Sequence, residues 1–295
     1  MTNNKVLVTG SKGFVGTHLC KYLKENGIEL VTTLNKQKPI DVTNIDQLLT
    51  IDCVDAIVHL AAKTSISDSF KDPSETYYTN FVGTLNVLEF AKTRNVKKFI
   101  YVSTYVYGQP LYLPVDEKHS VNPHSPYNNS KLLAEKICQN YSHYFGINMV
   151  TLRPFYVYGP NCRNRSLIPS IIRQIKKNGK VQLSGKKVKR DFLFVTDFVN
   201  LIEKILQDFP KGYNIYNVGY GKSYSLNQVA EGLARLFGMK IEIEFSKVTR
   251  PDVSDMVADI RKVSKEFNWK PTIDIKKGLQ LMFKDLVIEF CKCKD

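Results

Sequence analysis

A tyrosine and a lysine four positions apart are the first residues that could do chemistry. They are Tyr127 and Lys131 in SPYNNSKLLAEKI, a stretch that reads as the start of a helix. Residues at this spacing share one helix face. A phenol with a pKa near 10 is a poor base at neutral pH unless a nearby cation favours its phenolate. The pair fits either an acid/base with its helper or two ordinary surface residues, and the surrounding elements must decide.

Three glycines follow the first expected strand. Gly10, Gly13 and Gly16 lie in VTGSKGFVG, between a strand pattern and the helical pattern GTHLCKYLKENG. Glycines here allow a tight turn and let the amides of a helix N-terminus approach a pyrophosphate. Their spacing is Gly-x-x-Gly-x-x-Gly, and their place between strand and helix predicts a dinucleotide site.

The expected second strand ends in TTLNKQK, where dinucleotide folds often carry an acid that holds the adenosine ribose. Asn35 stands at that place and is followed by Lys36 and Lys38. A carboxylate would repel a 2′-phosphate, whereas an asparagine with nearby lysines tolerates or attracts one. This favours NADP(H), with NAD(H) as the alternative.

Strand and helix patterns alternate up to about residue 158. Near-continuous apolar runs such as DAIVHLAA and KKFIYVST indicate strands buried on both faces. Such alternation predicts an α/β fold with a doubly wound parallel sheet. We expect a dinucleotide-binding domain over 1–158, with elements near 190–218 returning to it. A smaller C-terminal α/β domain over 159–189 and 219–295 would bind substrate.

Composition sets the class of protein. The 295 residues are 43% apolar and the six cysteines lack zinc-type spacing, so we expect a globular, reduced, cytoplasmic protein with no metal site. No apolar stretch is long enough for a membrane span. A formal charge of +14 would suit nucleic acid, a membrane surface or a phosphorylated small molecule. Lysines spread along the chain are more typical of a solvated surface.

A set of motifs in a fixed order carries a family resemblance. The chain resembles the extended short-chain dehydrogenase/reductases, in the epimerase/dehydratase branch that modifies nucleotide sugars, through VTGSKGFVG, VHLAA (58–62), YVSTYVYG (101–108), SPYNNSKLLAE (125–135), LRPFYVYGP (152–160) and RDFLFVTD (190–197). The resemblance covers nearly the whole chain. It implies a Rossmann sheet, and a homodimer built on the Tyr127 helix and the helix from about 74 to 93.

The resemblance also implies roles for single residues. Tyr127 would be the general acid/base, Lys131 would lower its pKa and bind the nicotinamide ribose, and Ser103 would hydrogen-bond the substrate oxygen. The cofactor would be lined by Gly10, Gly13, Phe14, Val15, Gly16, Asn35, Lys36, Asp41, Val42, Leu60, Ala61, Ala62, Lys63, Asn80, Tyr127, Lys131 and Pro154. The substrate would contact Ser103, Thr104, Tyr105, Tyr127, Tyr156, Arg190 and Arg250. Both arginines would hold its diphosphate, since guanidinium groups suit bidentate phosphate contacts.

The family's reactions share hydride transfer at a ring carbon, so other residues must separate them. Dehydratases carry an acidic pair after the catalytic Ser/Thr, where this chain has Thr104 and Tyr105. Without that base the usual elimination is excluded. Asn35 with its lysines favours NADPH-dependent reduction of a 4-keto-6-deoxy sugar nucleotide for cell-surface polysaccharide precursors. Tyr156, where many epimerases have Asn, argues against an ordinary epimerase pocket without indicating another.

Two other functions stay open. An NAD-dependent nucleotide-sugar 4-epimerase needs only the Ser, Tyr and Lys set and a firmly held cofactor. A non-catalytic NADP(H)- or RNA-binding member would suit the charge, although the intact Ser103, Tyr127 and Lys131 argue against it and make nucleic acid an unexpected partner. Tyr105 fits an extra acid/base or a packed aromatic, and packing is the preferred interpretation.

Asn35→Asp tests the cofactor preference. We expect the wild type to bind NADPH more tightly than NADH, and the variant to shift towards NADH because its carboxylate repels a 2′-phosphate. Equilibrium titration of both cofactors measures this. Equal or tighter NADH binding by the wild type would contradict it.

Overall fold

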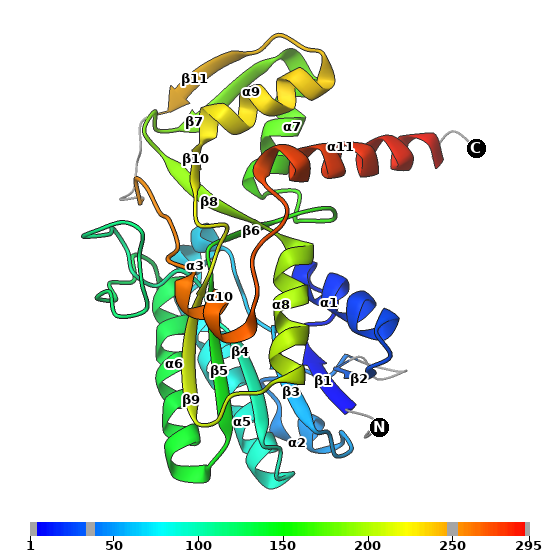
Figure 1. Cartoon of the computed structure of the whole chain (residues 1–295), viewed down its shortest axis with the longest axis vertical. Helices are drawn as coiled ribbons and strands as arrows, with labels where there is room; N and C mark the ends of the chain where they lie inside the picture. The colour runs from blue at the N-terminus through cyan, green and yellow to red at the C-terminus, as the bar shows by residue number, and fades with distance from the viewer. Residues whose placement is uncertain (1–4, 34–38, 247–252, 293–295) are drawn as a thin grey trace.

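A six-stranded parallel sheet forms the centre of the molecule, which confirms the expected α/β fold (Figure 1). The structure, a computed structural model, describes residues 5–33, 39–246 and 253–292. The strand order is β2-β1-β3-β4-β5-β9, and every neighbouring pair is parallel. These strands are β1 (Lys5–Thr9), β2 (Glu29–Thr32), β3 (Ala56–His59), β4 (Lys98–Val102), β5 (Asn148–Pro154) and β9 (Tyr213–Val218).

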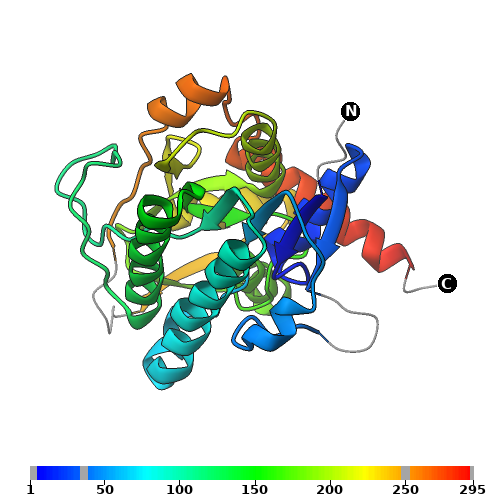
Figure 2. The same ribbon diagram turned by 90° about the horizontal axis from the view of Figure 1, so that it is seen from below.

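Helices cover both faces of this sheet, as a doubly wound fold requires (Figure 2). The helix expected near 74–93 is present as three successive segments, because a π-helical turn, η1, interrupts it. The helical segments are α1 (Phe14–Glu25), α2 (Ile45–Leu49), α3 (Ile66–Lys71), α4 (Pro73–Tyr77), η1 (Tyr78–Val82), α5 (Gly83–Thr93), α6 (Pro126–Phe145), α7 (Leu167–Asn178), α8 (Val195–Gln207), α9 (Leu226–Phe237), α10 (Arg261–Phe267) and α11 (Ile275–Lys292).

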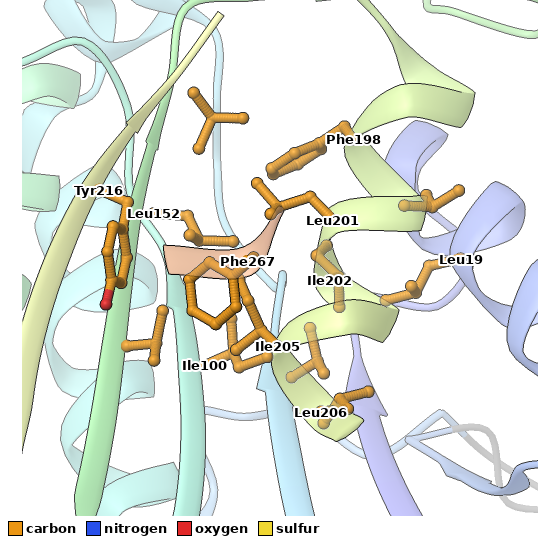
Figure 3. Packing of buried hydrophobic residues seen from close by; sticks show 14 of the residues in the cluster. Leu19, Ile100, Leu152, Phe198, Leu201, Ile202, Ile205, Leu206, Tyr216 and Phe267 are labelled. Atoms are coloured by element: carbon orange, nitrogen blue, oxygen red, sulfur yellow. The ribbon is translucent and has the colours of Figure 1, made fainter. Parts of the chain in front are cut away.

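The two faces of the sheet have separate apolar cores. On one face α1, α8 and α10 pack through residues such as Leu19, Ile202 and Phe267 (Figure 3). On the other face α2, α5 and α6 bury Leu48, Phe90 and Cys138. Residues 261–269, which the sequence assigned to the smaller domain, therefore pack against the large sheet. Burial on both faces explains the near-continuous apolar strands of the sequence.

Two small sheets lie beyond the large one. One has the order β10-β8-β6 and the other pairs β11 with β7. With α7, α9 and the start of α11 they enclose a third core, drawn above the large sheet in Figure 1. Their strands are β6 (Tyr156–Tyr158), β7 (Lys180–Ser184), β8 (Lys189–Phe194), β10 (Ser223–Ser225) and β11 (Glu242–Ser246).

Asp197, in the first turn of α8, fastens the chain between α10 and α11. Its buried carboxylate accepts hydrogen bonds from the Thr272 amide (3.0 Å), the Thr272 hydroxyl (2.8 Å) and the Ile273 amide (2.9 Å). The Trp269 indole donates to the Asp197 carbonyl at 3.1 Å. One side chain thus holds the segment that leads from the large sheet to α11.

Asp197→Ala should lower the free energy of unfolding by about 3 kcal/mol, because it leaves buried donors without an acceptor. Urea unfolding at 25 °C measures the change. Asp208→Ala, at the exposed end of the same helix, is the control and should stay within about 0.5 kcal/mol of the wild type. Equal losses in the two variants would contradict this role for the carboxylate.

Candidate active site

A cavity of about 620 Å³ opens where β1, β3, β4 and β5 end. The carboxyl ends of parallel strands are the usual place for a ligand in such sheets. The structure brings fourteen sequence-predicted site residues to its wall: Gly10, Gly13, Phe14, Val15, Gly16, Leu60, Ala61, Ala62, Ser103, Thr104, Tyr127, Lys131, Pro154 and Tyr156.

The glycine turn forms one end of the cavity. Gly10 has a φ of +67°, and a Cβ there would lie 2.7 Å from the Ala61 amide nitrogen. A Cβ on Gly16 would lie 2.2 Å from the Gly10 carbonyl oxygen. Gly13 caps α1 without a side-chain hydrogen bond, so the first amides of the helix are left for another acceptor. Backbone packed this closely fits the pyrophosphate of a dinucleotide.

Helix α6 brings Tyr127 and Lys131 to the cavity. The Ser125 side chain caps the helix by accepting from the Asn128 amide at 3.1 Å, so α6 begins just before the pair. Tyr127 and Lys131 are 9% and 2% exposed, and both line the cavity. They are not surface residues, so the chemical interpretation of their spacing is favoured.

Lys131 is a buried cation with an aromatic neighbour. Its ammonium nitrogen lies 4.3 Å from the centre of the Tyr101 ring. Burial lowers the pKa of Lys131 to about 7, and the nearby Cys138 and Glu135 act in the opposite direction. At neutral pH this ammonium is therefore close to losing its proton.

Tyr127 differs electrostatically from the sequence expectation. Burial raises the pKa of its phenol, while a hydrogen bond with Thr104 and the Arg163 guanidinium lower it. The lowering that the sequence led us to expect from Lys131 is not among these effects, and burial is the largest of them. The phenol keeps its proton at neutral pH, which suits a general acid.

The hydroxyl beside Tyr127 belongs to Thr104. Ser103, the sequence candidate, is 4% exposed and donates its hydroxyl to Glu135, which stands two helical turns after Tyr127, at 2.5 Å. The sequence placed the catalytic hydroxyl by counting back from VYG. The geometry instead favours the next residue along the chain, because successive side chains at a strand end point in opposite directions.

A second cavity of about 290 Å³ continues from the first. It shares Thr104, Tyr127 and Tyr156 with the first cavity and also contains Tyr105 and Arg190. Arg190, on β8, donates to the Val253 carbonyl at 2.7 Å. An arginine that lines the same cavity as the Tyr127 phenol suits the anionic part of an elongated ligand.

Tyr105 and Tyr156 are held by their surroundings. The Tyr105 hydroxyl donates to the Gly108 carbonyl at 2.6 Å, and its ring packs edge-on against Phe155. That geometry supports the packed-aromatic interpretation of Tyr105. The Tyr156 hydroxyl accepts from the Leu167 amide at 3.1 Å, so Tyr156 joins β6 to the start of α7.

Other predicted cofactor residues are not among the described residues that line the cavity. Asn80 is 1% exposed and binds both the amide (2.8 Å) and the carbonyl (2.9 Å) of Lys63, so it supports the 61–63 segment from behind. Val42 is in the core, and Asp41 accepts from the Thr43 amide at the turn before α2. The predictions for Asn35, Lys36 and Arg250 lie outside the described residues.

Sequence reasoning missed several residues of the two cavities. Arg163 lines the first, and its charge acts on Tyr127. A signal was present in the basic loop NCRNRS directly after LRPFYVYGP. Met256 lines the second cavity, but it comes from a loop whose approach no periodicity indicates.

The cavities lack acidic side chains. Among the described residues that line them there is no Asp or Glu. Within the described part of the chain no three His, Cys, Asp or Glu side chains gather as metal ligands. No described helix has the length and apolar character needed to cross a membrane.

A parallel sheet with a glycine turn and a buried Tyr–Lys pair defines a dinucleotide-dependent oxidoreductase of the short-chain type. The NAD dependent epimerase/dehydratase family matches residues 6–219. The chain belongs to that family, within the superfamily of nucleotide-sugar epimerases and reductases.

Relatives with different reactions are about equally similar. A UDP-glucuronate 4-epimerase from Thermodesulfobacterium geofontis is 33% identical over 93% of this chain and 93% of its own. A GDP-6-deoxy-D-mannose reductase from Pseudomonas aeruginosa is 30% identical over 95% of this chain and 96% of its own. The structure of RMD from Pseudomonas aeruginosa complexed with NADPH has a TM-score of 0.89 at 30% identity, covering 97% of this chain and 99% of that one.

Proposed function

We propose that the protein reduces a 4-keto-6-deoxy sugar nucleotide with NADPH. The observation that carries the proposal is the position of Tyr127, whose phenol is hydrogen-bonded to Thr104 and lies with Lys131 in a cavity whose described wall holds no carboxylate. An acid is what carbonyl reduction needs, whereas oxidation of an alcohol, the first step of 4-epimerisation, needs a base. Elimination by a neighbouring carboxylate has no candidate there.

The walls of the second cavity support the 6-deoxy sugar. Ile66, Phe155 and Met256 present apolar surface near Tyr127. A methyl group at C6 would bury favourably against these side chains. The similarity to a GDP-6-deoxy-D-mannose reductase and to a structure with NADPH points in the same direction.

The reaction assigns one task to each residue. When bound, NADPH supplies the hydride for the carbonyl carbon. Tyr127 gives its phenolic proton to the carbonyl oxygen, and the Lys131 ammonium stabilises the phenolate that remains. Thr104 keeps the phenol oriented through its hydroxyl, and Arg190 attracts the diphosphate. The glycine turn holds the cofactor's pyrophosphate.

A 4-epimerase is the second candidate, favoured by the similarity to the UDP-glucuronate 4-epimerase. It would use the same Tyr127 and Lys131 with NAD that stays bound. Interconversion of 4-epimers without added cofactor would establish it and exclude the reductase.

We further propose a homodimer, and a division into two domains in which residues 261–269 belong with the large sheet. Segments α4, η1 and α5 lie beside α6, and Tyr78 and Leu133 on these helices are 53% and 41% exposed. Such exposed apolar side chains on adjacent helices suit a helical interface. The sequence offers Leu85, Leu88, Leu132 and Ile137 for this interface. Leu88 is fully buried in the core, whereas the other three are partly exposed.

A screen of nucleotide sugars and their 4-keto-6-deoxy derivatives with NADPH and NADH tests the function. We expect consumption of NADPH with a 4-keto-6-deoxy substrate. Tyr127→Phe should lower turnover by about 10²–10⁴-fold, because one positioned general acid is lost. Its affinity for the nucleotide sugar, measured by calorimetry, should stay near the wild-type value. A fully active Tyr127→Phe would contradict the assignment.

Thr104→Val and Ser103→Ala separate the two hydroxyls. Thr104→Val should reduce kcat about 10²-fold, because the phenol loses its hydrogen-bond partner in the cavity. Ser103→Ala should keep kcat within about threefold, since its hydroxyl points to Glu135. Steady-state kinetics on the substrate found in the screen measure both. The reverse ranking would restore Ser103 as the catalytic hydroxyl.

A further inference from the structure

A buried ion pair continues the face of α6 that carries Tyr127 and Lys131. Glu135 and Arg153 are 2% and 4% exposed. The Arg153 Nη2 donates to Glu135 Oε2 at 2.6 Å, and its Nε reaches Oε1 and Oε2 at 3.1 and 3.2 Å. Ser103 adds a further donor to Oε1 at 2.5 Å. The carboxylate is therefore fixed in place from two strands, β5 and the end of β4.

The pair is itself held in position. Arg153 Nη1 donates to the Tyr107 hydroxyl at 2.8 Å, and Tyr107 donates to Asn217 Oδ1 at 2.6 Å. Asn217 on β9 is fully buried and donates to the Val115 carbonyl at 2.9 Å. Such a connected network leaves the Glu135 carboxylate little freedom to move.

Glu135 stands one helical turn after Lys131. Residues four apart on a helix have Cβ atoms about 5–6 Å apart. Both side chains are buried, so water screens their attraction little. A pair buried this deeply is weak evidence for stability, because removing both charges is often neutral. The position beside Lys131 therefore calls for another explanation.

Titratable and charged groups surround Lys131 on α6 and on the strands β3, β4 and β5. They are Tyr127, Glu135 and Cys138 on α6, Tyr101 on β4, His59 on β3, and Arg153 on β5. Burial lowers the pKa of His59 to about 3 and raises the pKa values of Tyr101, Tyr127 and Cys138, so these four are neutral at pH 7. Within this set Glu135 is the anion, and Arg153 approaches it from the side of β5.

We propose that Glu135 is a positioning residue whose Arg153-anchored carboxylate keeps Lys131 in its charged form, ready to stabilise the Tyr127 phenolate. Burial favours the neutral amine of Lys131, and a fixed anion one helical turn away favours the charged ammonium. Arg153 holds that anion in its own ion pair, so the anion does not pair with Lys131 directly. The ammonium is thus kept charged and left to face the cavity. The catalytic consequence rests on the proposed function, whereas the charge of Lys131 does not.

Competitive labelling with trace acetic anhydride tests the charge directly. Only the neutral amine reacts, so the yield of the acetylated Lys131 peptide against pH gives its titration midpoint by mass spectrometry. In Glu135→Gln the midpoint should fall by about one pH unit, because the nearby opposite charge that favours the ammonium is removed. Glu89→Gln is the matched control. Glu89, on α5, accepts a hydrogen bond from Tyr141, which lies on α6 ten residues after Lys131. It should leave the midpoint unchanged.

A double variant separates charge from packing. Glu135→Gln with Arg153→Met removes both charges and leaves no unpaired buried ion. It should fold and still show a midpoint at least about half a pH unit below the wild type. A wild-type midpoint in this variant would overturn the proposal. The proposal would also be overturned if neither Glu135→Gln nor the double variant folds while Glu135→Asp does. The carboxylate would then serve stability alone.

The pH dependence of the reduction rate tests the catalytic consequence. Wild-type reduction should fall as pH rises through about 7, because Lys131 loses its proton there, and in Glu135→Gln the fall should begin about one pH unit lower. A shifted midpoint in a protein that reduces no nucleotide sugar would sink the proposed function and leave the role of Glu135 intact. If the wild type is active but its Lys131 titration midpoint equals that of Glu135→Gln, the proposed function stands and the role of Glu135 is refuted.

Discussion

The packing of α6 against the parallel sheet is the constraint on which the site depends. This helix must bury Tyr127 and Lys131 against strands that are themselves apolar on both faces. Burying a cation costs free energy unless other charges or dipoles compensate. Here the compensation comes from the Tyr101 ring and from the Glu135–Arg153 pair, which joins α6 to β5. The same contact therefore fixes the helix and the charges along it.

Burial has opposite effects on the two reactive groups. It keeps the Tyr127 phenol protonated and brings the Lys131 ammonium close to deprotonation. A protonated phenol beside a marginally charged amine is arranged to donate a proton and then stabilise the anion. The electrostatics of the site therefore match carbonyl reduction, which links the packing of one helix to the direction of the proposed reaction.

The second cavity makes use of the smaller C-terminal part of the chain. Arg190 on β8 and Met256 reach the Tyr127 region because the β10-β8-β6 sheet stands beyond the ends of the large sheet. Asp197 and Trp269 tie this part to α8 through hydrogen bonds. A ligand with a reactive sugar and a diphosphate would span both regions, as clefts between packed units often require.

Much of the fold followed from short-range patterns. Apolar runs marked strands buried on both faces, glycines marked the turn after β1, and Ser125 marked the start of α6. These signals are local, because a strand's burial, a positive φ and a helix cap each depend on a few neighbouring residues. The strand–helix alternation likewise implied a parallel sheet, since chirality and short connections leave few other arrangements.

The tertiary structure decided what the local patterns could not. The sequence alone determined the class of fold, the glycine turn, and Tyr127 and Lys131 as candidates. Tertiary packing chose Thr104 over Ser103 as the hydroxyl beside the phenol, and it joined Glu135 to Arg153 across eighteen positions of chain. It also placed residues 261–269 on the large sheet. The direction of a side chain at a strand end, the charge of a buried group and the pairing of distant residues depend on the three-dimensional surroundings.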